Sequence, residues 1–114
     1  MQTPTNITFR SMDASPAVEQ AVADWCDRLE HTYGRIGHCS VVIELPHRRH
    51  RHGKTFHVRI ELALADRTIA VSRDPGHDHA HEDVYVALGD AFRAARRQLQ
   101  DYARIRRGDV KLHA

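Results

Sequence analysis

The segment KTFHVRIELAL, residues 54–64, alternates apolar and polar side chains with a period of two. This period predicts a β-strand, because successive side chains of a strand point to opposite faces of the sheet. Its apolar face would carry Phe56, Val58, Ile60, Leu62 and Leu64, and its polar face His57, Arg59 and Glu61. A sheet built from such a strand has one face to bury and one that can meet water, which limits the folds open to the chain.

Three further segments predict strands. ITFRS (7–11) alternates apolar and polar residues, and CSVVIEL (39–45) is rich in β-branched residues and ends before Pro46. TIAVSR (68–73) follows the tight connection ADR. The segments 39–45, 54–64 and 68–73 therefore predict an antiparallel meander.

Two segments have the periodicity of amphipathic helices. The first begins at Pro16, with Ser15 as its N-cap, and ends near Gly34 and Gly37. The second runs from Glu82 to about Arg107. At 100° per residue each helix has one apolar stripe, made by Val18, Val22, Trp25, Leu29 and Tyr33 in the first and by Val84, Leu88, Ala91, Phe92, Ala95, Leu99 and Tyr102 in the second. Trp25 and Tyr85 are interpreted as core or core-edge residues, and Tyr33 as either a core or a contact residue.

The order β-α-β-β-β-α predicts an α+β fold, a two-layer sandwich in which two helices cover one face of a four-stranded sheet. With 114 residues the chain is expected to form one domain, 1–114, with an ordered core at about 5–107 and a basic C-terminal tail. No apolar run approaches the roughly 20 residues that span a bilayer, and the N-terminus has no signal-peptide pattern. We therefore expect a cytoplasmic protein that does not enter a membrane.

Charge is unevenly distributed along the chain. Between Arg93 and Lys111 there are seven Lys/Arg and two acids, and between Arg48 and Lys54 there are four Lys/Arg and no acid. Acids gather instead within residues 13–30. Arg93, Arg97 and Arg104 fall on the side of the second helix opposite its apolar stripe, and Arg96 and Arg107 flank them. Either this is a solvated helix face, or its arginines bind phosphate, for which the planar guanidinium is well suited. The scarcity of Glu-to-Arg pairs along the helix favours phosphate.

The two histidine-rich stretches raise the question of a metal. In HRRHRHGK (47–54) the neighbouring arginines disfavour a dication, so this stretch is expected to meet RNA backbone, or else to be a plain hairpin tip. His77, His79 and His81, with Asp78 and Glu82 close by, are the better metal candidate. We expect neither a metal nor another cofactor, because no CxxC or HExxH motif is present.

Catalysis and a structural disulfide are also not expected. No nucleophile–base pair, phosphate loop or pair of carboxylates stands out, so we predict no enzymatic activity and no small-molecule substrate. Cys26 and Cys39 are expected to be small buried thiols, as is usual in a reducing compartment.

Two segments resemble a known family. DVYVALGDAFRAARRQL (83–99) is similar to the second helix of the ribosome hibernation-promoting factors and ribosome-associated inhibitors (sigma-54 modulation protein-like), with an aromatic near its start, Arg-Gln-Leu in its middle and a basic tail. RLEHTYGRIGHCSVVIEL (28–45) resembles the end of the family's first helix and its second strand. The order of elements is the family's, and the chain resembles its short form. As a short form it is expected to be without the C-terminal domain through which long-form members pair ribosomes, unless its last residues lead into a further segment.

The resemblance implies a function and a site. Family members bind the small ribosomal subunit near its decoding region and block the sites of tRNA and mRNA. The chain is thus expected to be a non-enzymatic, monomeric factor that binds the small subunit and its rRNA and inhibits translation or promotes hibernation. Arg97 matches the arginine of Arg-Gln-Leu, and Arg28 and Arg35 match basic positions at the end of the first helix, whereas Asp101 and Ala103 stand where some members carry lysines. The expected RNA-binding residues are Arg28, Arg35, Arg48, Arg49, Arg51, Lys54, Arg93, Arg96, Arg97, Arg104, Arg107 and Lys111.

Two other functions stay open at this point. One is a histidine-rich metal-binding or metal-sensing module. The other is a general double-stranded RNA-binding domain, suggested by the similar β-β-β-α ending.

The stretch 47–54 generates a testable prediction. Replacing Arg48, Arg49 and Arg51 with serine should weaken binding to ribosomes, because three phosphate partners are lost. Replacing the three histidines of this stretch with asparagine should do much less at about pH 7.5, where imidazole of ordinary pKa, about 6.5, is mostly neutral. Co-sedimentation with ribosomes, with and without a chelator, measures both. Loss of binding with the histidine variant and with the chelator, but not with the arginine variant, would instead indicate a metal site.

Overall fold

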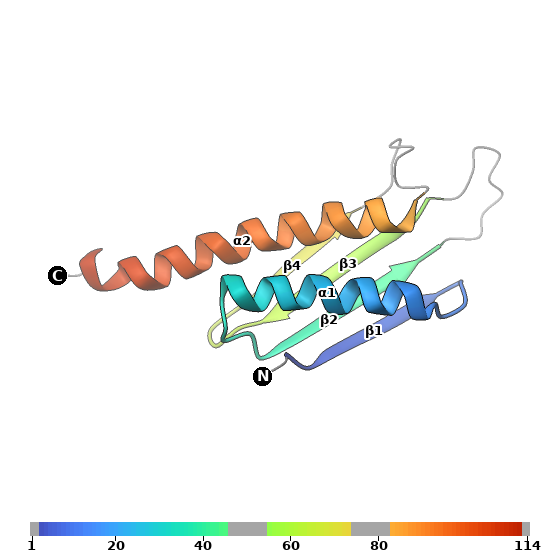
Figure 1. The fold of residues 1–114 in the computed structure, drawn as a ribbon. Coiled ribbons are helices and arrows are strands. Elements are labelled where there is room, and N and C mark those ends of the chain that lie inside the picture. The colour runs from blue at the N-terminus through green and yellow to red at the C-terminus, as the bar shows by residue number, and fades with distance from the viewer. Residues whose placement is uncertain (1–2, 46–54, 74–82, 113–114) are drawn as a thin grey trace.

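The computed structural model describes residues 3–45, 55–73 and 83–112. Its elements follow the order β-α-β-β-β-α that the sequence predicts. They are β1 (Thr5–Arg10), α1 (Pro16–Thr32), β2 (His38–Glu44), β3 (His57–Ala63), β4 (Thr68–Arg73) and α2 (Val84–Leu112). The fold is α+β, with a four-stranded sheet under two helices (Figure 1).

The sheet has the strand order β1-β2-β3-β4. β2, β3 and β4 form the predicted antiparallel meander, whereas β1 pairs parallel to β2. A parallel pair needs a long crossover connection, and α1 provides it. One row across the sheet joins Ile7, Val41, Ile60 and Val71, all of which point to the same face. This register places the apolar alternation of every strand on the side that the helices cover.

Both helices lie on that one face of the sheet, and they run in the same direction (Figure 1). Their contacts show this parallel packing, since Trp25 meets Phe92, and Tyr33, further along the chain from Trp25, meets Tyr102, further along from Phe92. The predicted stripe of α2 is buried apart from its first residue, Val84, which is half-buried. The largest fully buried side chain of the core is Phe92.

Some expectations were wrong in detail. Tyr85 is 49% exposed and is no core residue, because it lies beside the apolar stripe at the start of α2. α2 continues to Leu112 rather than ending near Arg107, so Gly108 does not end the helix, although glycine has a low helix propensity. The hairpin strand β3 is shorter than 54–64, although its alternation is as predicted.

The start of α1 is capped as the sequence predicts. The backbone of Ser15 is extended, its Oγ accepts a hydrogen bond from the backbone N–H of Val18 at 3.3 Å, and Pro16 follows in the first turn. This bond satisfies one of the N–H groups that have no partner within a helix.

Ser15→Ala should therefore lower the free energy of unfolding by about 1 kcal/mol, the usual value of an N-cap. Ser15→Asp is the matched control, because a carboxylate also accepts the bond from Val18. Urea denaturation followed by circular dichroism measures both variants. Equal losses in the two would show that the cap is not what stabilises this end of α1.

Candidate nucleic-acid interface

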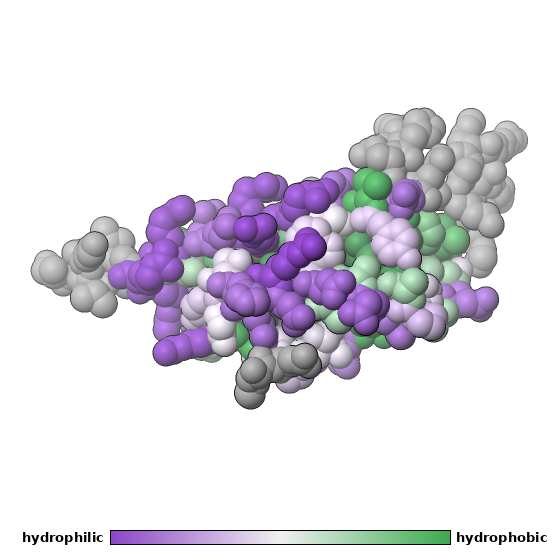
Figure 2. Space-filling model, viewed as in Figure 1, coloured by the Kyte–Doolittle hydropathy of each residue, from purple (hydrophilic) through white to green (hydrophobic). Residues whose placement is uncertain are grey.

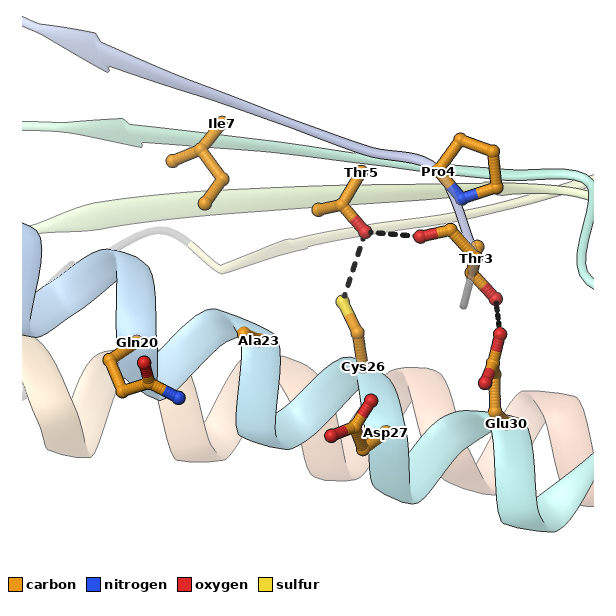
Figure 3. Close-up of a pocket in the computed structure, with 9 residues that line it drawn as sticks. All are labelled: Thr3, Pro4, Thr5, Ile7, Gln20, Ala23, Cys26, Asp27 and Glu30. Carbon is orange, nitrogen blue, oxygen red and sulfur yellow. Dashed lines mark hydrogen bonds between the residues drawn. The ribbon is translucent and has the colours of Figure 1, made fainter. Parts of the chain in front are cut away.

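The two edges of α1 carry opposite charges. Asp27 and Glu30 lie on the edge that faces β1, where they line a hollow with Thr3 and Thr5 (Figure 3). Arg28 lies on the other edge, over the ring of Trp25, toward α2. The sequence predicted that acidic and basic residues lie in different segments of the chain. The structure shows in addition that they lie on opposite edges of the single helix α1.

Trp25 holds two arginines at the junction of the helices. Its ring stacks on Phe92, with centroids 5.6 Å apart and planes 5° from parallel. The guanidinium carbon of Arg28 lies 4.5 Å from the centroid of Trp25, and that of Arg93 lies 6.0 Å from it. Such cation–π contacts fix the position of a guanidinium without neutralising its charge. Gly89 leaves space for this arrangement, because a Cβ there would lie 3.1 Å from a nitrogen of the Arg93 guanidinium.

Helical geometry divides the surface of α2 into two sides. Gln98, Asp101 and Ile105 face β4, where they line a shallow depression with Arg67 and Thr68. The predicted arginines lie on the other side and on the outer face, and all of them are exposed: Arg93, Arg96, Arg97, Arg104 and Arg107. Figure 2 shows strongly hydrophilic side chains over most of α2 in this view. Together with Arg28, these five arginines are called the basic helical surface.

Not all of these arginines are uncompensated, which corrects the expectation from the sequence. Arg93 pairs with Asp90 at 3.0 Å and Arg104 with Asp101 at 2.7 Å, each three residues along the helix. These pairs were not predicted because the expectation rested on glutamate partners, whereas the partners are aspartates. Such exposed pairs contribute little, because water screens them and the side chains lose freedom.

Three arginines of α2 do remain unpaired. Arg96, Arg97 and Arg107 form no ion pair or side-chain hydrogen bond with any residue in the described ranges. Their guanidinium groups can therefore bind phosphate without first leaving another partner.

The other predicted residues lie apart or outside the description. Arg35 is exposed in the connection between α1 and β2. Arg48, Arg49, Arg51 and Lys54 lie outside the described residues, as does the histidine-rich stretch 77–81. Lys111 lies in the last turn of α2, but its side chain is not described.

A second basic cluster, absent from the sequence prediction, lies where α2 passes the β3–β4 turn. The hydroxyl of Tyr102 donates a hydrogen bond to Oδ1 of Asp66 at 2.7 Å, and Arg106 approaches Oδ2 of Asp66 at 3.6 Å. The guanidinium carbon of Arg67 lies 5.2 Å from the centroid of Tyr102, whose ring also meets the edge of Tyr33. The sequence did hold one indication of this cluster, because Arg106 falls on the apolar stripe of the helix. A basic residue in that position needs a polar partner beside the core.

This cluster shifts two ionisation equilibria. The hydrogen bond from Tyr102, with Arg106 and Arg67 in addition, holds the pKa of Asp66 below its ordinary value. The same bond is the main cause that raises the pKa of Tyr102. The cluster thus ties the distal part of α2 to the sheet and keeps two further arginines beside it.

Among the residues that the structure describes, no group of three or more His, Cys, Asp or Glu side chains could hold a metal ion. In the same ranges, no helix is both long enough and apolar enough to cross a membrane.

The fold and the exposed arginines of α2 define a small α+β protein with a long basic helix. The sequence model of the family described as "Sigma 54 modulation protein / S30EA ribosomal protein" matches residues 5–107. The chain therefore belongs to this family, as its sequence had indicated.

Solved structures share the fold. The N-terminal domain of Protein Y from Thermus thermophilus superimposes with a TM-score of 0.68 at 16% identity, over 90% of this chain and 99% of that one. A ribosomal subunit interface protein from Coxiella burnetii gives a TM-score of 0.71 at 16% identity, over 89% and 98% of the two chains. No curated protein sequence matches the chain significantly.

The Tyr102–Asp66 bond can be tested by its pH dependence. Tyr102→Phe should raise the pKa of Asp66 toward its ordinary value, because the main cause of the depression is lost. A depressed carboxylate pKa stabilises the fold above the unfolded-state pKa, and this contribution disappears as the pH falls through the folded-state pKa. The variant should therefore be less stable than the parent at neutral pH, and the difference should shrink in acid. Carboxyl NMR titration and urea denaturation measure the two effects.

Tyr33→Phe is the control, because Tyr33 meets the ring of Tyr102 and leaves the Asp66 bond intact. An unchanged pKa of Asp66 in Tyr102→Phe would show that the arginines alone set it.

Proposed function

We propose that this protein is a non-enzymatic, ribosome-associated factor that binds the small ribosomal subunit through its basic helical surface. On the subunit it would block the binding sites of tRNA and mRNA, and so inhibit translation or promote hibernation. It would act as a monomer in the cytoplasm. Membership of the family supports the ribosome as partner, as does the fold shared with a ribosomal subunit interface protein.

The observation that carries the proposal is the set of unpaired arginines on α2. Arg96, Arg97 and Arg107 present forked donors that fit phosphate oxygens in two-point contacts. Arg28 and Arg93 add charge at the helix junction, where Trp25 limits their freedom. Because less side-chain entropy remains to be lost, arginines held in this way bind phosphate at lower cost.

The acidic edge of α1 would set the orientation. Asp27 and Glu30 would meet repulsion from rRNA if the domain were rotated to present β1. On the outer sheet face Arg59 is bound to Glu61 at 2.7 Å. The charge pattern thus favours one docking face, formed by α2 and the junction with α1.

Mechanically, the domain would act by occupancy. α2 has 29 residues and spans about 43 Å at 1.5 Å per residue, which is long enough to follow several phosphates of a folded RNA. Its attachment to the sheet through Phe92 and Tyr102 gives it one orientation. A rigid helix of this length would exclude another RNA from the same binding site by steric occlusion, without any chemical step.

A pair of double variants with equal change in charge tests the face. Arg96→Gln with Arg97→Gln should weaken binding to purified small subunits at least tenfold. It should also reduce the slope of log affinity against log salt by about 1.5, since each lost phosphate contact removes roughly 0.7–0.9. Binding is measured by co-sedimentation between about 50 and 200 mM salt.

Arg10→Gln with Arg59→Gln is the matched control, because both arginines are exposed on the outer sheet face. It should leave the affinity and the slope nearly unchanged. Equal losses in the two double variants would indicate attraction by net charge alone. No loss in either would remove the basic helical surface from the interface, and equal binding to large subunits would argue against the small subunit as target.

A further inference from the structure

Two thiols from different layers of the fold meet beside a surface hollow. Sγ of Cys26, on α1, lies 3.6 Å from Sγ of Cys39, on β2, and both cysteines are free. Their separation along the chain is 13 residues, so a bond between them would join the helix layer to the sheet. A disulfide, with its S–S bond of about 2.05 Å, needs the two sulfur atoms only about 1.5 Å closer together than they are.

Only one of the two thiols borders the hollow. Cys26 lines a hollow of about 600 Å³ between α1 and β1, together with Thr5, Asp27 and Glu30 (Figure 3). Its exposed fraction is 7%, whereas that of Cys39, which lies behind it in the core, is 1%. A small reagent that enters the hollow would therefore meet Cys26 first.

We propose that Cys26 and Cys39 form a peroxide-oxidisable dithiol, in which Cys26 is the attacking thiol and Cys39 the resolving one, and which closes to a reversible disulfide between α1 and β2. This proposal does not depend on ribosome binding.

Two hydrogen-bond partners of Cys26 favour its ionised form. The hydroxyl of Thr5 lies 3.8 Å from Sγ of Cys26 and can donate to it, although in the resting state it also reaches the carbonyl oxygen of Thr3 at 3.0 Å. The hydrogen bond with Cys39 is the main cause that lowers the pKa of Cys26, against the opposing effects of burial and of the Asp27 and Glu30 carboxylates. The same bond raises the pKa of Cys39, so Cys26 ionises first. The thiolate is the form that reacts with peroxide.

The disulfide would form in two steps. The Cys26 sulfur attacks one oxygen of hydrogen peroxide, the O–O bond breaks, and the products are a sulfenic acid on Cys26 and hydroxide, which takes up the proton that Cys26 released. The Cys39 sulfur then attacks the Cys26 sulfur, the S–O bond breaks, and the leaving hydroxyl takes the Cys39 proton as water. The two thiols are oxidised by two electrons in total, and the peroxide is reduced to two waters.

The walls of the hollow select the oxidant. Asp27 and Glu30 place negative charge around Cys26, and this charge opposes anionic reagents. Hydrogen peroxide is small and uncharged, whereas oxidised glutathione is large and anionic. We therefore expect peroxide, rather than glutathione disulfide, to be the effective oxidant.

The first experiment uses the reduced full chain, with hydrogen peroxide as the probe. Intact mass should fall by two hydrogen atoms, peptide mapping should join Cys26 to Cys39, and dithiothreitol should reverse both changes. The melting temperature of the oxidised chain should rise by roughly 10 °C, the effect of closing a loop of this length in a domain of this size. Disulfide-linked dimers, or an unchanged mass, would overturn the proposal.

Single variants assign the two roles. In Cys39→Ser, peroxide should leave a sulfenic acid on Cys26 that dimedone labels, because no resolving thiol remains. In Cys26→Ser, Cys39 should give no adduct. Labelling of Cys39 in Cys26→Ser at the rate seen for Cys26 would reverse or remove the assignment. If either variant does not fold, the peptide map of the parent chain still decides whether the bond forms.

The selectivity has its own control. At equal concentration, oxidised glutathione should react at least tenfold more slowly than peroxide. Asp27→Asn should raise the rate with glutathione severalfold, whereas Asp24→Asn, which removes an exposed carboxylate of α1 outside the hollow, should not. Equal rates for the two oxidants in the parent chain would refute the role given to Asp27 and Glu30.

Discussion

The stacking of Trp25 on Phe92 is the contact on which the arrangement of the helices depends. Phe92 has no exposed surface, so it fixes α2 on the sheet, and Trp25 joins α1 to it with nearly parallel rings. Such a pair contributes about 0.5–1.5 kcal/mol beyond the area it buries. Its larger effect is on the surface, because the ring that joins the helices also holds the guanidinium groups of Arg28 and Arg93.

The same two helices separate the charges of the molecule. Asp27 and Glu30 of α1 lie toward β1 and Arg28 lies toward α2. On α2, Asp90 and Asp101 lie within one turn of Arg93 and Arg104. Local ion pairs of this kind reduce the repulsion between arginines along the helix, and they weaken its positive electrostatic potential at longer range only a little. Among the described residues, the unpaired Arg96, Arg97 and Arg107 lie on the exposed side of α2, and such a set favours association with a polyanion through this helix.

Most of the fold could be predicted because its signals are local. The period of two in 54–64, the two helical stripes and the cap at Ser15 each depend on neighbours in the sequence, and the structure confirms them. The parallel pairing of β1 with β2 depends on residues far apart in the chain, and no local pattern encodes it. Within the site, helical spacing found the exposed arginines, but the partners of Arg106 and of Cys26 could be seen only once the turn and the sheet were placed beside the helices.

The position of Cys26 on α1 separates the redox chemistry from the basic surface. Cys26 faces β2 and the hollow, whereas Trp25, its neighbour in sequence, faces α2, so a bond to Cys39 would fix α1 to the sheet without touching the helix junction. Oxidation also removes no cation. A disulfide would therefore change how firmly α1 is held, through the entropy of the unfolded chain, and leave the arginines that face α2 where they are. One helix can in this way carry a thiol of the pair on one side and part of the basic helical surface on the other, with stability as the main property that oxidation would alter.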